Sequence, residues 1–330
     1  MRGRFLATVG MCAAILTAGA GASQATEFKI SFGPRADFAS EIYTAGWILK
    51  NYVNDTSKTL TVSLYPNSGL GDVVPTYEAM RMGSGASCQI SGTAELNGFY
   101  KRLGVFDLPF LWKNYDHAHK VFDGPIAQKI TDELEKAVGI RIVSFMDSWG
   151  YRNVATSKAD VKSVADLKGL KIRTLPSPVY VAALQLLGAN ATPMGYSEVY
   201  TAMKTGVLDG YEVTPSMIQA QRFYEVSKYV TLTHHLFSPV VLACSSQQWN
   251  SLTADEKKVF EDGARLAADI NRAMAPLREA QSVEFLKKQG MVIREVDMTK
   301  LLEEAPKTQM EFAEKLGGKD LLEEIIAAGK

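Results

Sequence analysis

The chain has 330 residues, 46% of them hydrophobic, and 36 basic residues balance 36 acidic ones. The apolar fraction is typical of a folded globular protein and excludes an intrinsically disordered chain. The balanced charge gives no electrostatic basis for binding nucleic acid or an anionic membrane surface.

Residues 1–25 predict a secretory signal peptide. Arg2 and Arg4 form a basic start, the apolar run FLATVGMCAAILTAGAG follows, and small residues precede the expected cleavage after Ala25. The apolar run is too short and too rich in glycine for a membrane span, and VGMC around Cys12 is a poor lipoprotein box. We therefore expect an exported, soluble protein of about 305 residues, enough for roughly two domains.

Strand-like and helical patterns alternate after the signal. The runs FKISFG, LTVSLYP and ASCQISG read as strands, and residues 36–55 and 73–82 show helical spacing. This alternation predicts an α/β sheet covered on both faces. A short internal similarity, LTVSLYP to LKIRTLP (170–176) and YEAMRMG (77–83) to YTAMKTG (200–206), suggests two similar α/β lobes.

Only Cys88 and Cys244 remain after cleavage of the signal. An oxidising compartment permits a disulfide between them, and two buried free thiols are the alternative. Two distant cysteines lack the clustered spacing of a zinc site. The histidine pairs 117/119 and 234/235 do not share one face of a helix or strand, so we predict no metal site.

A long helix is expected toward the C-terminus. Thr253 and Glu256 form a capping box that opens a helical pattern running toward Gly290. At 1.5 Å per residue, such a helix would span roughly 54 Å and cross both lobes. The alternative is two helices broken at Pro276.

The sequence lacks the marks of an enzyme. Outside the signal there is no G-x-S-x-G elbow, no G-x-x-x-x-G-K-[ST] phosphate loop and no G-x-G-x-x-G. The acidic residues do not group as an acid–base pair, and no cofactor is indicated. An unfamiliar exported α/β enzyme remains an alternative.

Arg173 is the first candidate for ligand binding. It lies near the end of a predicted strand, where α/β sheets place their ligands, and Pro176 and Pro178 stiffen the exit. The guanidinium fork can donate two parallel hydrogen bonds to a carboxylate. On position alone, an ordinary surface cation is the alternative.

Five segments in order resemble the solute-binding proteins of TRAP transporters, the tripartite sodium-driven uptake systems for organic acids. They cover nearly the whole chain after the signal: residues 64–72, 104–124, 149–157, 187–215 and 223–235, including LYPNSGLGD, WGYRNVATS and LGANATPMGYSEVYTAMKTGVLDGYEVTP. The resemblance implies a binding protein without enzymatic activity. It would deliver its ligand to a permease with a small and a large membrane subunit. A binding protein for an ABC transporter or a sensor is the alternative.

The resemblance also implies a fold, a two-lobed periplasmic-binding-protein architecture (type II-like) with a hinge and the long helix spanning both lobes. We expect residues 26–148 with 239–278 to form lobe I, and 149–238 with 279–330 to form lobe II. The ligand would occupy a central cleft that closes by hinge motion.

The family pattern assigns roles to residues of lobe II. Arg173 would form the main salt bridge to the ligand carboxylate, Arg152 would assist, and Glu212 would orient a site arginine. Val213 stands where the family often has asparagine, which removes a polar contact. Pro176 stands where sialic acid binders have asparagine, so a sialic acid ligand is not expected.

Further cleft residues are expected from both lobes: Tyr196, Trp149, Arg35, Thr93 and Glu95. Glu198 would bridge the lobes on closure. Glu95 and Arg35 favour a hydroxylated cargo such as a sugar acid. Val213, Trp149 and Tyr196 also allow an apolar monocarboxylate, and that choice stays open.

Overall fold

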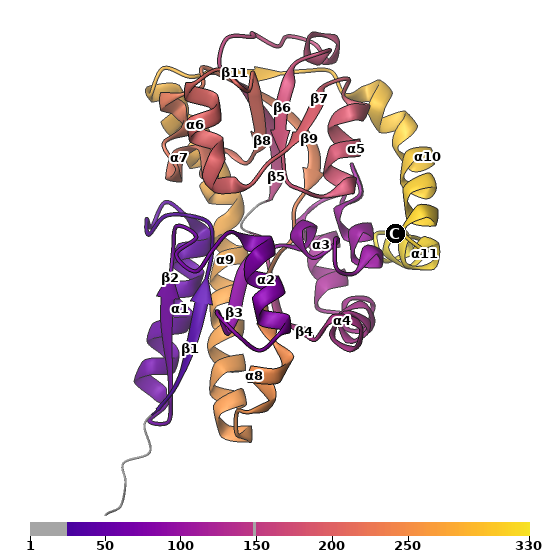
Figure 1. The fold of residues 1–330 in the computed structure, drawn as a ribbon. Helices are drawn as coiled ribbons and strands as arrows, with labels where there is room; N and C mark the ends of the chain where they lie inside the picture. Colours follow the sequence, from indigo (N-terminus) through magenta and orange to yellow (C-terminus); the bar gives the residue numbers. More distant parts are fainter. Residues whose placement is uncertain (1–24, 148–149) are drawn as a thin grey trace, which may run out of the picture.

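The computed structural model describes residues 25–147 and 150–330, so the expected signal peptide lies outside the described residues except for Ala25. The described chain forms two α/β lobes, one above the other in Figure 1, each built on its own sheet. This confirms the predicted two-lobed α/β class. One lobe begins the chain, and the chain passes between the lobes more than once.

The sheet of lobe I has five strands, in the order β2-β1-β3-β10-β4. β1 pairs in parallel with β2 and β3, and β10 pairs antiparallel with β3 and β4. The strands span β1 (Thr26–Ser31), β2 (Leu60–Tyr65), β3 (Cys88–Gly92), β4 (Ile140–Met146) and β10 (Val240–Ser245). β10 follows the strands of lobe II in sequence, so this sheet is completed late in the chain.

The sheet of lobe II has six strands, in the order β11-β9-β5-β8-β6-β7. β6 pairs in parallel with β7 and β8, and β5 lies antiparallel between β8 and β9. The strands span β5 (Tyr151–Thr156), β6 (Lys171–Thr174), β7 (Asn190–Pro193), β8 (Gly210–Val213), β9 (Tyr229–Phe237) and β11 (Val292–Glu295). Apart from β11, the arrangement repeats that of lobe I.

The internal similarity therefore reflects related lobes, but its strand alignment was wrong. α2 (Val73–Arg81) and α6 (Val199–Lys204) hold equivalent places, each before the middle strand of the five that the two sheets share. β2 is the edge neighbour of β1, whereas β6 corresponds to β1 itself, because each of these two lies between two parallel neighbours. The counterpart of β2 is β7, the edge strand next to β6. The sequence alignment failed because short apolar strands before proline look alike wherever they lie in a sheet.

The long helix α9 (Ala254–Lys288) confirms the prediction of one helix through Pro276. Thr253 and Glu256 make both hydrogen bonds of the capping box. At 1.5 Å per residue the helix is about 52 Å long. It packs against α1 (Glu41–Thr56) and β4 in lobe I and against α7 (Pro215–Ala220) and β11 in lobe II, so it crosses the whole molecule (Figure 1).

The other helices cover the sheets. Lobe I carries η1 (Thr93–Glu95), η2 (Lys101–Asp107), α3 (Tyr115–Phe122), α4 (Pro125–Val138) and α8 (Ser246–Asn250), and lobe II carries η3 (Val164–Leu167), α5 (Pro178–Leu186), η4 (Tyr196–Glu198) and η5 (Phe223–Glu225). α10 (Thr299–Lys315) and α11 (Lys319–Ala328) follow β11.

The C-terminal helices differ from the predicted lobe boundary, which assigns residues 279–330 to lobe II. β11 joins the sheet of lobe II, but α10 contacts η2 and α11 contacts α3 and α4. Ala313, Leu321 and Ile325 are buried in the same cluster as Leu103 and Phe106 of lobe I. The end of the chain thus returns to lobe I, because these apolar faces match there.

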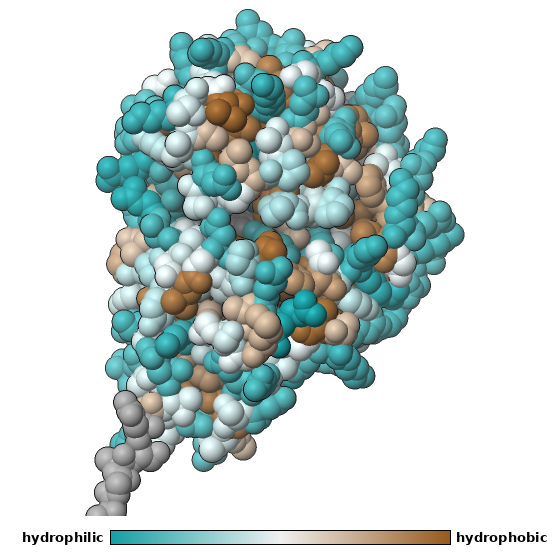
Figure 2. All heavy atoms as spheres, viewed as in Figure 1, coloured by the Kyte–Doolittle hydropathy of each residue, from teal (hydrophilic) through white to brown (hydrophobic). Residues whose placement is uncertain are grey.

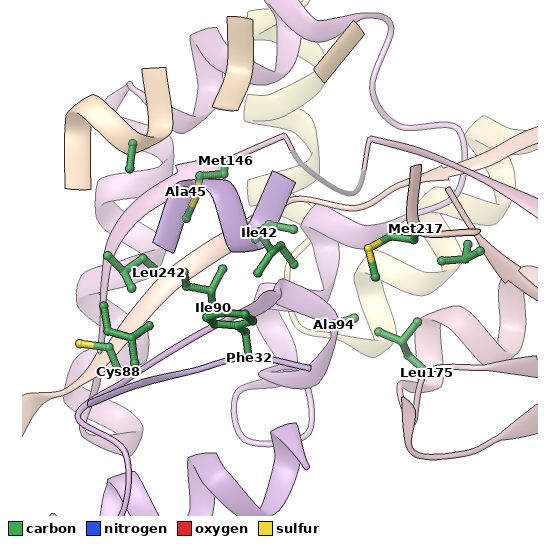
Figure 3. Packing of buried hydrophobic residues seen from close by; sticks show 14 of the residues in the cluster. Phe32, Ile42, Ala45, Cys88, Ile90, Ala94, Met146, Leu175, Met217 and Leu242 are labelled. Carbon is green, nitrogen blue, oxygen red and sulfur yellow. The ribbon is translucent and has the colours of Figure 1, made fainter. Parts of the chain in front are cut away.

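One hydrophobic cluster is continuous across the two lobes. Phe32, Ile90 and Ala94 of lobe I belong to the same buried cluster as Leu175 and Met217 of lobe II (Figure 3). Hydrophilic residues cover most of the face shown in Figure 2, and the hydrophobic residues on it form small separate groups. Among the described helices, none is both long and apolar enough to span a membrane.

Cys88 of β3 lies opposite Cys244 of β10 and forms a disulfide with it, which decides between the two alternatives. We expect replacement of both cysteines by alanine to lower the free energy of unfolding by about 2–4 kcal/mol, because the bridge joins residues 156 positions apart. Urea unfolding of the oxidised protein and of the double variant measures this. Two titratable thiols in the native oxidised protein would contradict the disulfide.

Candidate functional site

A narrow cavity lies where the two lobes meet. Lobe I lines it with Gly33, Pro34, Val73, Ile90, Ser91 and Glu95, and lobe II lines it with Arg152, Arg173, Leu175, Tyr196, Val213 and Met217. Half of these residues lie in, or directly after, strands of the two sheets. Seven of the lining residues were not predicted as site residues: Gly33, Pro34, Val73, Ile90, Ser91, Leu175 and Met217.

Arg173 projects from β6 and is only 3% exposed. Its Nε and Nη2 donate to the carbonyl oxygen of Met194 at 3.0 and 2.7 Å, and its guanidinium lies 5.7 Å from the ring centre of Tyr196. One edge of the fork is therefore fixed by backbone. No described carboxylate forms an ion pair with Arg173, so this cation lacks a protein counter-ion in direct contact.

Arg152 is anchored differently, by the carboxylate of Glu212. Its Nε donates to one carboxylate oxygen, and its Nη2 donates to the other at 3.0 Å and to the Glu212 carbonyl at 2.8 Å. Thr174 donates to the same carboxylate at 2.9 Å. Glu212 is fully buried and does not line the cavity. It therefore orients a site arginine, and that arginine is Arg152.

The two guanidiniums have opposite electrostatic situations. Burial is the largest single effect on Arg152 and lowers its pKa, but the charge and hydrogen bonds of Glu212, together with Tyr180 and Glu95, outweigh burial and the pKa is raised. For Arg173, burial dominates and lowers the pKa; Glu212 opposes this and the Arg152 charge adds to it. An anion in the cavity would relieve the cost of burying the Arg173 charge. The geometry suits a carboxylate, which can accept from both arginines.

Glu95 of η1 faces the arginines from lobe I. Its Oε2 is buried without a hydrogen-bond partner, and burial raises the pKa of Glu95 to about 8 despite the charges of Arg152 and Arg173. The hydroxyl of Tyr196 is likewise buried without a partner. A ligand hydroxyl could satisfy both groups, since a hydroxyl donates and accepts.

The remaining wall of the cavity is apolar. Val73 and Ile90 contribute from lobe I, and Leu175, Val213 and Met217 from lobe II. Val213 thus lines the cavity, with an apolar side chain in place of the amide that the family pattern often has. The wall suits the C–H face of a short carbon chain.

Other predicted residues lie elsewhere. Thr93 is fully buried, donates to Asp107 Oδ1 at 2.8 Å, and does not line the cavity. Trp149 lies outside the described residues. Between the lobes it is Ser197, rather than the predicted Glu198, that makes a contact, donating to Asp72 Oδ2 at 2.8 Å.

Arg35 lies outside the cavity, in an open groove of about 780 Å³. We call this the outer groove; segments 33–36 and 66–68 of lobe I and 196–200 and 221–225 of lobe II line it. Gly33 and Tyr196 line both spaces. Within residues 25–147 and 150–330, no three or more His, Cys, Asp or Glu side chains are placed to hold a metal ion.

Residues 43–315 match the family model for bacterial extracellular solute-binding proteins, family 7 (DctP). The 2,3-diketo-L-gulonate-binding periplasmic protein YiaO of Escherichia coli K12 is 32% identical over 73% of this chain and 73% of its own. The galactonate complex of the sugar acid binding protein DctPAm of Advenella mimigardefordensis superposes with a TM-score of 0.86 at 28% identity, covering 92% of this chain and 98% of that one.

A further similar structure is a TRAP periplasmic solute-binding protein of Polaromonas sp. JS666 bound to D-erythronate. It has a TM-score of 0.85 at 29% identity and covers 92% of this chain and 98% of that chain. The similarity extends over both lobes in sequence and in structure.

The raised pKa of Glu95 predicts a pH effect on stability. The unfolded value is 4.5 and the folded value about 8, so the contribution of this carboxyl is complete below pH 4.5 and is lost as pH rises toward 8. Glu95→Gln cannot ionise. Relative to the wild type, we expect the free energy of unfolding of the ligand-free variant to rise by more than about 1 kcal/mol between pH 5 and pH 8.

Urea unfolding of both proteins at pH 5, 6.5 and 8 tests this. Glu41 and Asp107, whose pKa values burial raises to about 7, are present in both proteins, so their effect cancels in the comparison. A difference that stays constant with pH would mean that Glu95 is solvated in the free protein.

Proposed function

The chain belongs to the bacterial extracellular solute-binding proteins of family 7, and on that basis we propose that its cargo is a hydroxylated organic acid held by Arg173. Proteins of this family bind solutes for transport and are not enzymes. The chain is accordingly a solute-binding protein for a small organic acid taken up by a TRAP-type transporter. The similarity covers both lobes and gives no support to the enzyme alternative.

The arrangement of charges at the cavity carries the proposal. Arg173 is buried with a backbone carbonyl as its anchor and no carboxylate in contact, next to an arginine already neutralised by Glu212. A carboxylate bound here would accept from a fixed fork in a site of low dielectric. Such charge-assisted pairs are about twice as strong as neutral hydrogen bonds.

The polar and apolar walls support the hydroxylated class. Glu95 and Tyr196 each present an unpartnered polar atom, which an apolar monocarboxylate would leave unsatisfied at a cost of about 1–3 kcal/mol each. Sugar acids supply hydroxyls there and C–H groups to Val213 and Met217. The related galactonate and erythronate complexes agree with this class.

Closure follows from contacts with both lobes. A ligand between Glu95 of lobe I and Arg173 of lobe II stabilises the closed form more than the open one. Moving the population from 1:99 to 99:1 requires about 5.5 kcal/mol of such preference. Direct hydrogen bonds between the lobes also favour the closed form: Ser197 donates to Asp72 at 2.8 Å, and Tyr180 donates to Asp107 at 3.4 Å.

Partners and location complete the proposal. The loaded protein would deliver its acid to the small and large permease subunits of a TRAP transporter. It would do so in the periplasm, after removal of the signal peptide at residues 1–25. The family description as extracellular solute-binding protein supports this compartment.

Arg173→Ala should weaken binding of the cargo at least 100-fold without unfolding the protein, because unpairing a buried carboxylate–arginine contact costs about 2–5 kcal/mol. Arg173→Lys should also bind weakly, since an ammonium cannot reproduce the fork. The cargo is found by a thermal-shift screen of C4–C6 aldonates, including galactonate and erythronate, and then measured by titration calorimetry.

Lys171→Ala is the matched control, as it removes an exposed cation from the same strand. It should bind as the wild type does. If Arg173→Ala retained near-normal affinity, Arg173 would not be the carboxylate anchor.

A further inference from the structure

The outer groove contains two arginines that the cavity does not use. Arg35 comes from the β1–α1 loop of lobe I and Arg222 from the α7–η5 junction of lobe II, and both side chains are exposed. Neither has a hydrogen-bond or ion-pair partner for its guanidinium among the described residues. Two uncompensated cations therefore meet at one groove from opposite lobes.

The lining of the groove carries little negative charge. Glu225 is the only acid in its lining, and its carboxylate accepts a hydrogen bond from the Tyr200 hydroxyl at 2.8 Å. The lining thus has a net positive charge. The field of surface charges extends about 8 Å at physiological salt, so a net positive groove favours anions.

Buried polar groups without partners also mark the groove. The side-chain amide nitrogen of Gln221 has none, although only 9% of that residue is exposed. The Tyr196 hydroxyl is in the same state. Both residues line the groove. Buried donors are normally satisfied, so the Gln221 amide, which lines the groove but not the cavity, points to a ligand that supplies an acceptor there.

The backbone around the groove is strained. Asn67, Ser68 and Arg222 have φ of 57°, 53° and 56°, and all three line the groove. Non-glycine residues in the left-handed region cost about 1–3 kcal/mol each and cluster at ligand-binding positions. The strain agrees with a functional role but does not define the ligand.

The groove is adjacent to the cavity that holds the acid. Gly33 and Tyr196 belong to both linings and lie close together across the lobes, since a Cβ placed on Gly33 would lie 3.3 Å from Tyr196 Cδ1. A ligand anchored at Arg173 whose chain passes this boundary would place its far end in the outer groove.

We propose that the outer groove binds a second anionic group at the far end of the same hydroxy acid, held between Arg35 of lobe I and Arg222 of lobe II. The cargo class is then a dianionic sugar acid, either a diacid or a phosphorylated acid. The inference rests on the proposed function, because the first carboxylate must be at Arg173. The second anion also relieves the repulsion between the two arginines when the lobes close.

Matched ligands test this. Gluconate and glucarate, and galactonate and galactarate, differ within each pair only in a terminal CH2OH or carboxylate; 6-phosphogluconate tests phosphate. Titration calorimetry on the wild type should show the dianion of at least one pair, or 6-phosphogluconate, binding at least 10-fold more tightly than its monoanion. Which of them gains identifies the second group.

Arg222→Gln should remove this preference and leave the monoanion affinity within about threefold. Lys204→Gln removes an exposed cation from the same lobe and should retain the preference. In the wild type, raising NaCl from 50 to 500 mM should shrink the preference, because the Debye length falls. That measurement needs no variant.

Equal affinity for monoanions and dianions in the wild type would overturn the inference. An equal loss of affinity for monoanions and dianions in a folded Arg222→Gln variant would overturn it too. The same holds for a dianion preference that does not change with salt. If monoanions bind through Arg173 without any dianion preference, only the outer-groove inference fails. If no acid binds in an Arg173-dependent way, the proposed function fails as well.

Discussion

The buried pair of Arg152 and Glu212 is the interaction on which the site depends. Removing one partner of such a pair is strongly destabilising, because the other charge stays buried. The carboxylate oxygens of Glu212 accept hydrogen bonds from Arg152 and Thr174, and no described hydrogen bond joins them to the guanidinium of Arg173. Arg173 is left with the carbonyl of Met194. Arg152 is thus a neutralised cation in the cavity wall, whereas the charge of Arg173 can be balanced by an anion that enters the cavity.

The sequence predicted features that depend on local chemistry. Thr253 with Glu256 marked the start of α9 because the capping box is made within four residues. The fold class and Arg173 followed from alternation, strand position and family resemblance. The disulfide did not follow, because it depends on the register of β3 against β10, strands more than 150 residues apart in sequence.

The unpredicted site residues share a physical reason. Met217 and Leu175 look like any core residue, since only the meeting of two lobes turns part of a core face into a ligand wall. Thr93 was assigned to the ligand because it follows a strand, but its neighbour Asp107 is 14 positions away and takes its hydroxyl. Arg222 gave no signal, as a lone arginine in a polar loop is usually solvated.

The crossing of the chain has a consequence for biogenesis. β10 completes the sheet of lobe I only after all but one strand of lobe II have been made, and α10 and α11 cover lobe I from beyond α9. Lobe I can therefore not finish folding while the ribosome or a translocation channel still holds α10 and α11. A polypeptide cut short before Leu321 would expose the apolar surface around Leu103 and Phe106. The returning helices thus couple completion of the chain to burial of the lobe I core.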